Sequence, residues 1–238
     1  MNRKSSISSR ELKHSLWIII LLTLVFGFDD GNDTFILSQW SYNLLNVFIL
    51  VSASIFANAI GAKICAMHLG TEAELGVLSI NKSINILGFK AKSIPLASIF
   101  SLFLMLISKG AIYFTSIFTI TTKEISFGRT MDESKEAFIY FWALASNVIL
   151  VIIFEHFSIE LGVLINTYII IWNMLPIPGF LGSKILFNNK ILYIFFFVFI
   201  VFFLLFAGKI NIIILLIMAS LIAFLAMIFW MFKREYKP

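Results

Sequence analysis

Three side chains able to bind a metal ion follow one another along the chain: Cys65, His68 and Glu72. Their spacing of i, i+3 and i+7 predicts that they share one face of a helix or of its end. A thiolate, an imidazole and a carboxylate together can hold zinc. A single cysteine in an apolar run is more often a small hydrophobic side chain, and His68 is expected at the membrane interface. We therefore predict no metal and no other cofactor, with these three as the alternative ligands.

Other catalytic chemistries have less support in the residues. Every aspartate lies in residues 29–33 or at Asp132, outside the apolar runs, which excludes a pair of intramembrane aspartates. The serines within apolar runs do not occupy a G-x-S-x-G-like turn, which a serine nucleophile would need. The formal net charge is +5, but no helical face rich in lysine and arginine follows from the pattern. A nucleic acid partner is therefore not expected.

The elements that must position these residues are apolar helices. Of 238 residues, 60% are hydrophobic and 13% charged, more apolar side chain than a soluble domain can bury. Several uncharged runs reach the ~20 residues that a helix needs to cross a bilayer. Helices satisfy their own backbone in lipid, so the fold class is all-α, a polytopic helical membrane protein. Residues 1–238 form a single membrane domain with six predicted helices, at 15–28, 42–68, 137–154, 159–178, 191–207 and 210–232.

The distribution of basic residues decides how the apolar segment 93–108 is counted. If this segment crosses the membrane, lysines and arginines divide almost evenly between the two sides. If it is re-entrant, the chain has six spans, and Lys209 alone lies outside the cell while Lys63 lies within a span. Cytoplasmic loops carry the excess of basic residues, so the re-entrant arrangement is favoured. We expect a multi-pass protein of the cell membrane with both termini in the cytoplasm.

Four stretches in a fixed order resemble one protein family. Ser8 begins an S-x-x-E-L-K start, and NAIGAKICAMHLGTEAEL from Asn58 has the layout H-E-x-x-H-K-x-x-A followed by G-x-x-A-E. GAIY at Gly110 precedes FWALASN, which ends at Asn147, and NMLPIPGFLGSK from Asn173 has the layout N-x-x-P-x-P-x-x-D-G-x-K. The chain resembles the site-2 protease family of intramembrane zinc metalloproteases, especially its compact archaeal branch. The core motifs fall within residues 42–186, which implies a site-2-protease-like core.

The resemblance identifies the positions of the family's catalytic residues, but the side chains at these positions differ from those of the family. In this family two histidines and an aspartate hold zinc, and a glutamate is the general base for the bound water. The corresponding residues here are Asn58, Ala62 and Leu181 for the ligands and Ala59 for the base. An amide is a poor zinc ligand, and alanine and leucine offer no donor. The family's substrate region lies beside five further residues, which we take as candidates for a partner groove: Asn147, Asn173, Pro176, Pro178 and Gly182.

The resemblance therefore implies a catalytically inactive homologue of site-2 protease. Such a protein would act by binding membrane proteins or transmembrane segments within the lipid bilayer, in a regulatory, chaperone-like or assembly role. A larger membrane complex is one setting for such a role. One alternative is an active intramembrane metalloprotease with atypical ligands. Another is a purely structural membrane subunit without a groove. For Asn173 two roles stay open, a hydrogen bond to an extended peptide or a bond that holds the broken helix.

Overall fold

The computed structural model describes residues 8–29, 35–79, 84–86, 89–91, 94–124 and 132–235. The described chain is mostly helical, as predicted, with short strands between some of the helices. The elements in chain order are α1 (Ser9–Gly27), α2 (Leu37–His68), β1 (Thr71–Val77), β2 (Ile84–Ile86), β3 (Phe89–Ala91), α3 (Leu96–Ile107), β4 (Phe118–Glu124), α4 (Glu133–His156), α5 (Glu160–Met174), α6 (Leu181–Asn188), α7 (Lys190–Phe206) and α8 (Ile212–Glu235).

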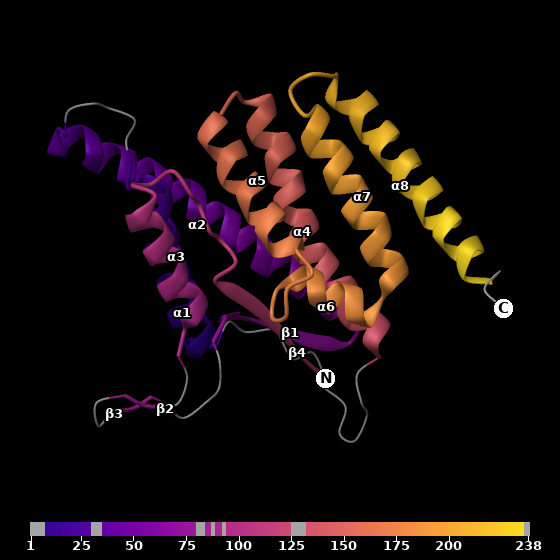
Figure 1. Cartoon of the computed structure of the whole chain (residues 1–238), viewed down its shortest axis with the longest axis horizontal. Coiled ribbons are helices and arrows are strands. Elements are labelled where there is room, and N and C mark those ends of the chain that lie inside the picture. Colours follow the sequence, from indigo (N-terminus) through magenta and orange to yellow (C-terminus); the bar gives the residue numbers. More distant parts are fainter. Residues whose placement is uncertain are drawn as a thin grey trace.

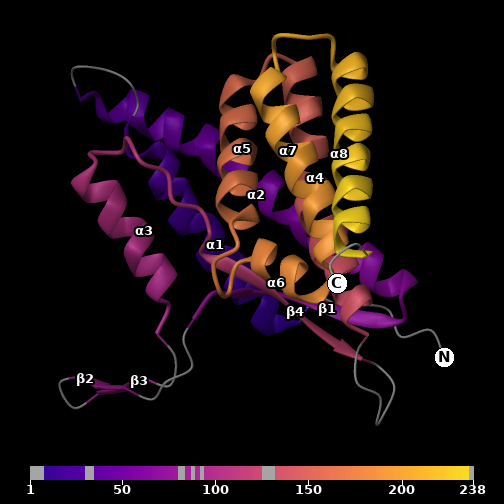
Figure 2. The same cartoon turned by 45° about the vertical axis from the view of Figure 1, so that its right-hand side comes forward.

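The long helices form two groups joined by α2. Helices α4, α5, α7 and α8 run alongside one another, and α2 crosses this group at an angle (Figure 1). Helices α1 and α3 lie on the other side of α2 (Figure 2). Helix α2 packs against α1, α4, α5 and β1, so it is the element that connects both groups. The β1–β4 sheet and α6 lie at one end of the helices, where α6 packs against α4 (Figure 1).

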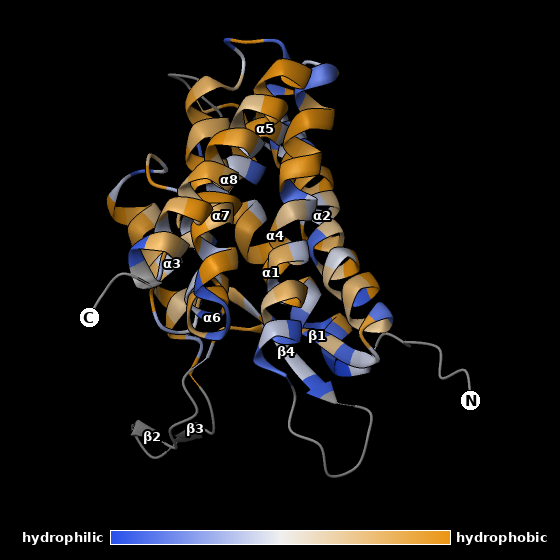
Figure 3. Ribbon diagram, turned by 90° about the vertical axis from the view of Figure 1, so that its right-hand side faces the viewer, coloured by the Kyte–Doolittle hydropathy of each residue, from blue (hydrophilic) through white to orange (hydrophobic). Residues whose placement is uncertain are grey.

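Three of the described helices are long and apolar enough to cross a membrane, namely Leu37–His68, Glu133–His156 and Ile212–Lys233. Two shorter apolar helices, α3 and α7, accompany them. Large apolar side chains remain exposed on the outer helix faces, such as Leu221, Leu225 and Phe229 of α8 at 58%, 62% and 71%. Orange, hydrophobic residues cover the helices in Figure 3. This surface suits a protein surrounded by lipid.

The prediction of an all-helical fold missed two small antiparallel sheets. Strand β1 pairs with β4, with Leu75 opposite Ile120, and β2 pairs with β3. In β1, buried Thr71, Ala73 and Leu75 alternate with more exposed residues, the period of two that a strand requires. Strand β4, with the sequence FTITTKE, is rich in the β-branched residues that favour strands. The fold is therefore helical with a strand pair at one end.

The helix predicted at 159–178 ends earlier than expected, because α5 stops at Met174 and Pro176 follows. A separate short helix, α6, then begins at Leu181. A Cβ on Gly182 would overlap the carbonyl oxygen of Met174, so only glycine allows the two helices to approach this closely. The first predicted helix, 15–28, instead begins at Ser9, because the Ser8 hydroxyl caps it by accepting from Glu11 N. The predicted cytoplasmic ends at residues 1–7 and 236–238 lie outside the described residues.

Candidate functional site

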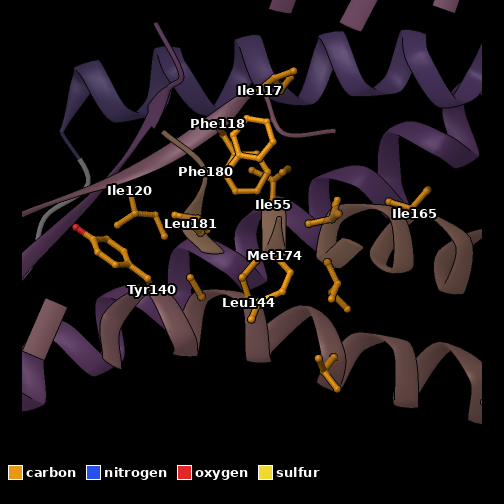
Figure 4. Close-up of a cluster of buried hydrophobic side chains, with 14 of the residues drawn as sticks. Ile55, Ile117, Phe118, Ile120, Tyr140, Leu144, Ile165, Met174, Phe180 and Leu181 are labelled. Atoms are coloured by element: carbon orange, nitrogen blue, oxygen red, sulfur yellow. The ribbon is translucent and has the colours of Figure 1, made fainter. Parts of the chain in front are cut away.

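The positions that the resemblance aligns with the zinc ligands of site-2 proteases are all buried. Asn58 and Ala62 lie one turn apart on the inner face of α2, with 0% and 2% of their surface exposed. Leu181, the first residue of α6, is also fully buried. Ala62 and Leu181 belong to the same hydrophobic cluster, and Ala59 packs against its edge. Figure 4 shows Leu181 within this cluster. Apolar side chains and one amide therefore occupy the positions that the resemblance aligns with metal ligands.

A chain of buried amides joins three helices beside this cluster. Asn58 Nδ2 donates to Asn147 Oδ1 at 2.8 Å, and Asn147 Nδ2 donates to Asn166 Oδ1 at 2.9 Å. Asn166 Nδ2 then donates to the carbonyl oxygen of Gly162, one turn back in α5. Asn58 Oδ1 is buried and has no hydrogen-bond partner within the described part of the chain. The amides tie α2, α4 and α5 together through neutral side chains alone.

The other groove candidates separate into two groups. Asn173 is fully buried, where Nδ2 donates to Ile169 O at 3.0 Å and Oδ1 accepts from Ser116 Oγ at 3.2 Å. Both ends of this amide are thus engaged by its own helix and by the segment before β4. Gly182 is buried against Met174, whereas Pro176 and Pro178 are exposed in the turn before α6. Two openings described below, one on α2 and α4 and one beside the β1–β4 sheet, are not lined by any of these candidates.

The three alternative metal ligands do not share a helix face. Cys65 is half-buried in α2, and His68 is the last residue of that helix, with Nδ1 2.8 Å from Ile64 O. Glu72 lies beyond the helix, on strand β1, because α2 ends at His68 and the chain turns through Gly70. Within the described ranges, no group of three or more His, Cys, Asp and Glu residues is placed to hold a metal ion.

Lys63, which was predicted to lie within a span, forms a buried ion pair. Its Nζ lies 2.8 Å from Glu11 Oε2, with side chains 16% and 4% exposed. Glu11 Oε1 accepts from the backbone N–H of Leu75 at 3.2 Å. One carboxylate therefore connects α1, α2 and the outer edge of β1. Sequence patterns show such a pair poorly, since the two residues lie 52 positions apart.

A second polar cluster holds α6 against β4 and α4. Lys184 Nζ donates to Thr119 Oγ1 at 2.7 Å and to Ile120 O at 2.6 Å, and it lies 5.0 Å from the centre of the Tyr140 ring. Burial lowers the pKa of Lys184 to about 8, while Glu136 opposes this shift. Glu136 itself accepts from Asn188 Nδ2 at 2.9 Å. These bonds position Leu181 at the start of the same helix.

An apolar opening lies elsewhere, on the outer side of α2 and α4. This lateral groove has a volume of about 800 Å³ and is lined mainly by apolar side chains. Gly61 forms its floor, since a Cβ there would overlap Ser146 Oγ and lie 2.6 Å from Trp142 O. The close crossing at Gly61 lets the two helices diverge on either side of it. The lining comprises Ala57, Ile60, Gly61, Ile64, Cys65, His68, Leu69, Phe138, Trp142, Ser146, Ile149 and Leu150.

The comparisons with known proteins add no relative: no family model, no curated protein and no solved structure matches the chain. Sequence reasoning missed the lateral groove, Asn166 and the role of Glu11. The spacing of Ala57, Gly61, Ile64 and His68 along one stripe of α2 was the available signal for the groove. Glu11 was part of the S-x-x-E-L-K stretch, but its contact with Lys63 depends on how α1 and α2 pack.

Proposed function

We propose that this protein is a catalytically inactive homologue of site-2 protease that binds transmembrane segments of other membrane proteins. The absence of catalysis is supported by the side chains at the four motif positions. Asn58 uses its amide N–H on Asn147, and Ala59, Ala62 and Leu181 carry no donor atom for zinc and no base. Ala62 and Leu181 also pack within the hydrophobic cluster, which leaves no buried charge to be neutralised by a metal.

The lateral groove is the observation that carries the binding part of the proposal. Helix association in lipid depends on close packing, and small residues allow two backbones to approach. Ala57 and Gly61 lie one turn apart on α2, and Ser146 faces them from α4. Larger side chains flank this floor, among them Ile64 and Trp142, which are 51% and 45% exposed. A single helix with a small-residue face is the occupant that fits this shape.

Filling the lateral groove is expected to weaken association with a single-span helix about tenfold, because helix association in lipid depends on close packing. A tenfold change corresponds to about 1.4 kcal/mol. The filled variant is Ala57→Leu/Ile64→Trp. The probe is a leucine–alanine helix with a Gly-x-x-x-Gly face, reconstituted with the purified protein in vesicles. Energy transfer between labels on the two molecules measures association.

Leu221→Trp is the matched control, because Leu221 is 58% exposed on α8, away from the lateral groove. It adds a comparable aromatic ring to a lipid-facing helix and should leave association unchanged. If the probe does not associate with the unmodified protein, or if the control weakens association as much as the filled variant, the groove does not bind helices and the proposal fails.

The proposed topology has six spans with both termini in the cytoplasm and a re-entrant segment at 93–108. Its support is the length of α3, since twelve residues span only about 18 Å as a helix, against the ~30 Å of a hydrocarbon core. With Cys65→Ser as background, Lys135→Cys, at the start of α4, should react with a membrane-impermeant maleimide only after the cells are opened. Lys209→Cys should react in intact cells. Labelling of position 135 from outside would instead mean that α3 crosses.

A further inference from the structure

A second opening, which the proposed function does not use, lies between the start of α1 and the outer face of the β1–β4 sheet. This basic pocket has a volume of about 510 Å³, and its lining includes Arg10, His14 and Trp17 of α1 with Glu74, Gly76 and Lys123 of the sheet. The pairing of the strands builds its floor. Gly76 lies opposite Thr119 and Glu74 opposite Thr121, whereas Leu75 and Ile120 turn to the core.

The charges of the basic pocket favour an anion. Arg10 has no ion-pair partner among the described residues, and Lys123, whose side chain is 70% exposed, lies 4.0 Å from Glu74. Glu74 is the acid of the lining, and its carboxylate also accepts from the Ser8 hydroxyl. Two permanent cations and one histidine thus line the pocket with a single carboxylate, which already accepts a hydrogen bond from Ser8. An anionic group entering here would meet Arg10 without displacing an existing ion pair.

The surroundings of the basic pocket favour an anion attached to apolar chains. Trp17 is 49% exposed at its rim, and tryptophan is enriched where the bilayer meets water. An exposed apolar stripe leads away from the pocket along α1, formed by Trp17, Ile20 and Leu24 at positions i, i+3 and i+7. The sheet end of the molecule is hydrophilic and the adjoining helices are hydrophobic (Figure 3). The basic pocket therefore lies at the level of lipid headgroups.

We propose that the basic pocket binds the headgroup of an anionic phospholipid, whose acyl chains lie along the exposed stripe of α1. Arg10 and Lys123 would contact the phosphate, and Trp17 would hold the glycerol region at the interface. Basic pockets beside membrane helices recognise anionic headgroups in this way. In the proposed topology the pocket faces the cytoplasm, although lipid binding does not require that orientation. The site is separate from the lateral groove, so either proposal can fail without the other.

The test compares lipids that share acyl chains and differ in charge. Purified full-length protein in detergent is titrated with phosphatidylglycerol or phosphatidylcholine, and bound lipid is counted by native mass spectrometry. Phosphatidylglycerol is expected to bind at least about tenfold more tightly than phosphatidylcholine. The double variant Arg10→Gln/Lys123→Gln is expected to weaken phosphatidylglycerol binding about 25-fold, since each cation contributes roughly fivefold. Glycerol phosphate, which has the same charged group without chains, is expected to bind too weakly to detect.

Two further variants separate a built pocket from general attraction. Gly76→Val should abolish binding without changing the charge, because a Cβ at position 76 would lie 3.7 Å from His14 Nδ1 and the rest of the side chain would occupy the basic pocket. Lys135→Gln removes a cation from the start of α4, outside the pocket lining, and should change nothing. Equal binding of both lipids, equal loss with Lys135→Gln, unchanged binding in Gly76→Val, or tight binding of glycerol phosphate would each overturn the proposal.

Discussion

Replacing Glu11 with leucine is expected to lower the free energy of unfolding by about 3–5 kcal/mol, the usual cost of removing one partner of a buried ion pair. Lys63 would keep a charge in a side chain that is only 16% exposed, without its carboxylate at 2.8 Å. The N–H of Leu75 would also lose its acceptor. Because Glu11 connects α1, α2 and β1, the variant should expose the edge of β1. Denaturant unfolding in detergent, followed by circular dichroism, measures the change.

Two comparisons make this result specific to the buried pair. The double variant Glu11→Leu/Lys63→Met should regain most of the lost stability, since replacing both charges with apolar groups is often nearly neutral. Lys123→Met, which removes a cation 4.0 Å from Glu74 at the exposed face of the sheet, should cost less than about 1 kcal/mol. A loss below 1 kcal/mol for Glu11→Leu, with no recovery in the double variant, would mean that the pair does not hold α1 in place.

The helices were predictable because each depends on a local run of apolar residues. The predicted segment 137–154 lies within α4, and 191–207 and 210–232 match α7 and α8 within three residues at each end. Their ends differ because caps and turns decide them, as Asp132 does for α4 by accepting from Ser134 N. The pattern of residues over a short window is thus enough to predict that a helix exists. It is not enough to predict the residues at which the helix begins and ends.

The strands and the polar contacts were not predictable in the same way, because they depend on residues distant in the sequence. Thr71 pairs with Glu124 across the whole of α3, and nothing local to either strand specifies the other. Asn58, Asn147 and Asn166 likewise meet only after three helices have packed. The resemblance drew attention to the first two, but it offered no reason to select Asn166. The sequence alone therefore indicated candidates for the polar core without indicating which of them touch.

Zinc binding is the second large effect, and it is expected when the ligands and the base that the resemblance implies are introduced. The quadruple variant Asn58→His, Ala59→Glu, Ala62→His and Leu181→Asp should bind one zinc ion per chain if the backbone has kept the geometry that the resemblance implies. Asn58 and Ala62 are one turn apart on one buried face of α2, as two imidazole ligands require. Leu181 belongs to the same buried cluster as Ala62. Elemental analysis of the purified variant measures the metal.

Stability in the presence and absence of zinc reports the same site independently. Without metal, the new carboxylates and imidazoles replace apolar packing around Leu181, and burying polar groups without partners costs several kcal/mol. Zinc should recover this loss, because binding to the folded chain adds RT ln(1 + [Zn²⁺]/Kd) to the free energy of unfolding. The melting temperature of the quadruple variant should therefore fall below that of the natural sequence with a chelator and rise with added zinc.

A variant with a misplaced third ligand distinguishes a formed site from histidines that bind zinc alone. It carries the same three changes on α2 but Ile185→Asp in place of Leu181→Asp, one turn further along α6, where Ile185 is also fully buried. It should lose as much stability as the quadruple variant and gain little with zinc, since ligand distances tolerate errors of only about 0.2 Å. Proteolysis is expected to stay weak in both, because the groups around the ligands that orient an imidazole are absent. If the quadruple variant folds and holds no zinc, the four positions do not converge, and the resemblance to site-2 protease is limited to the sequence pattern.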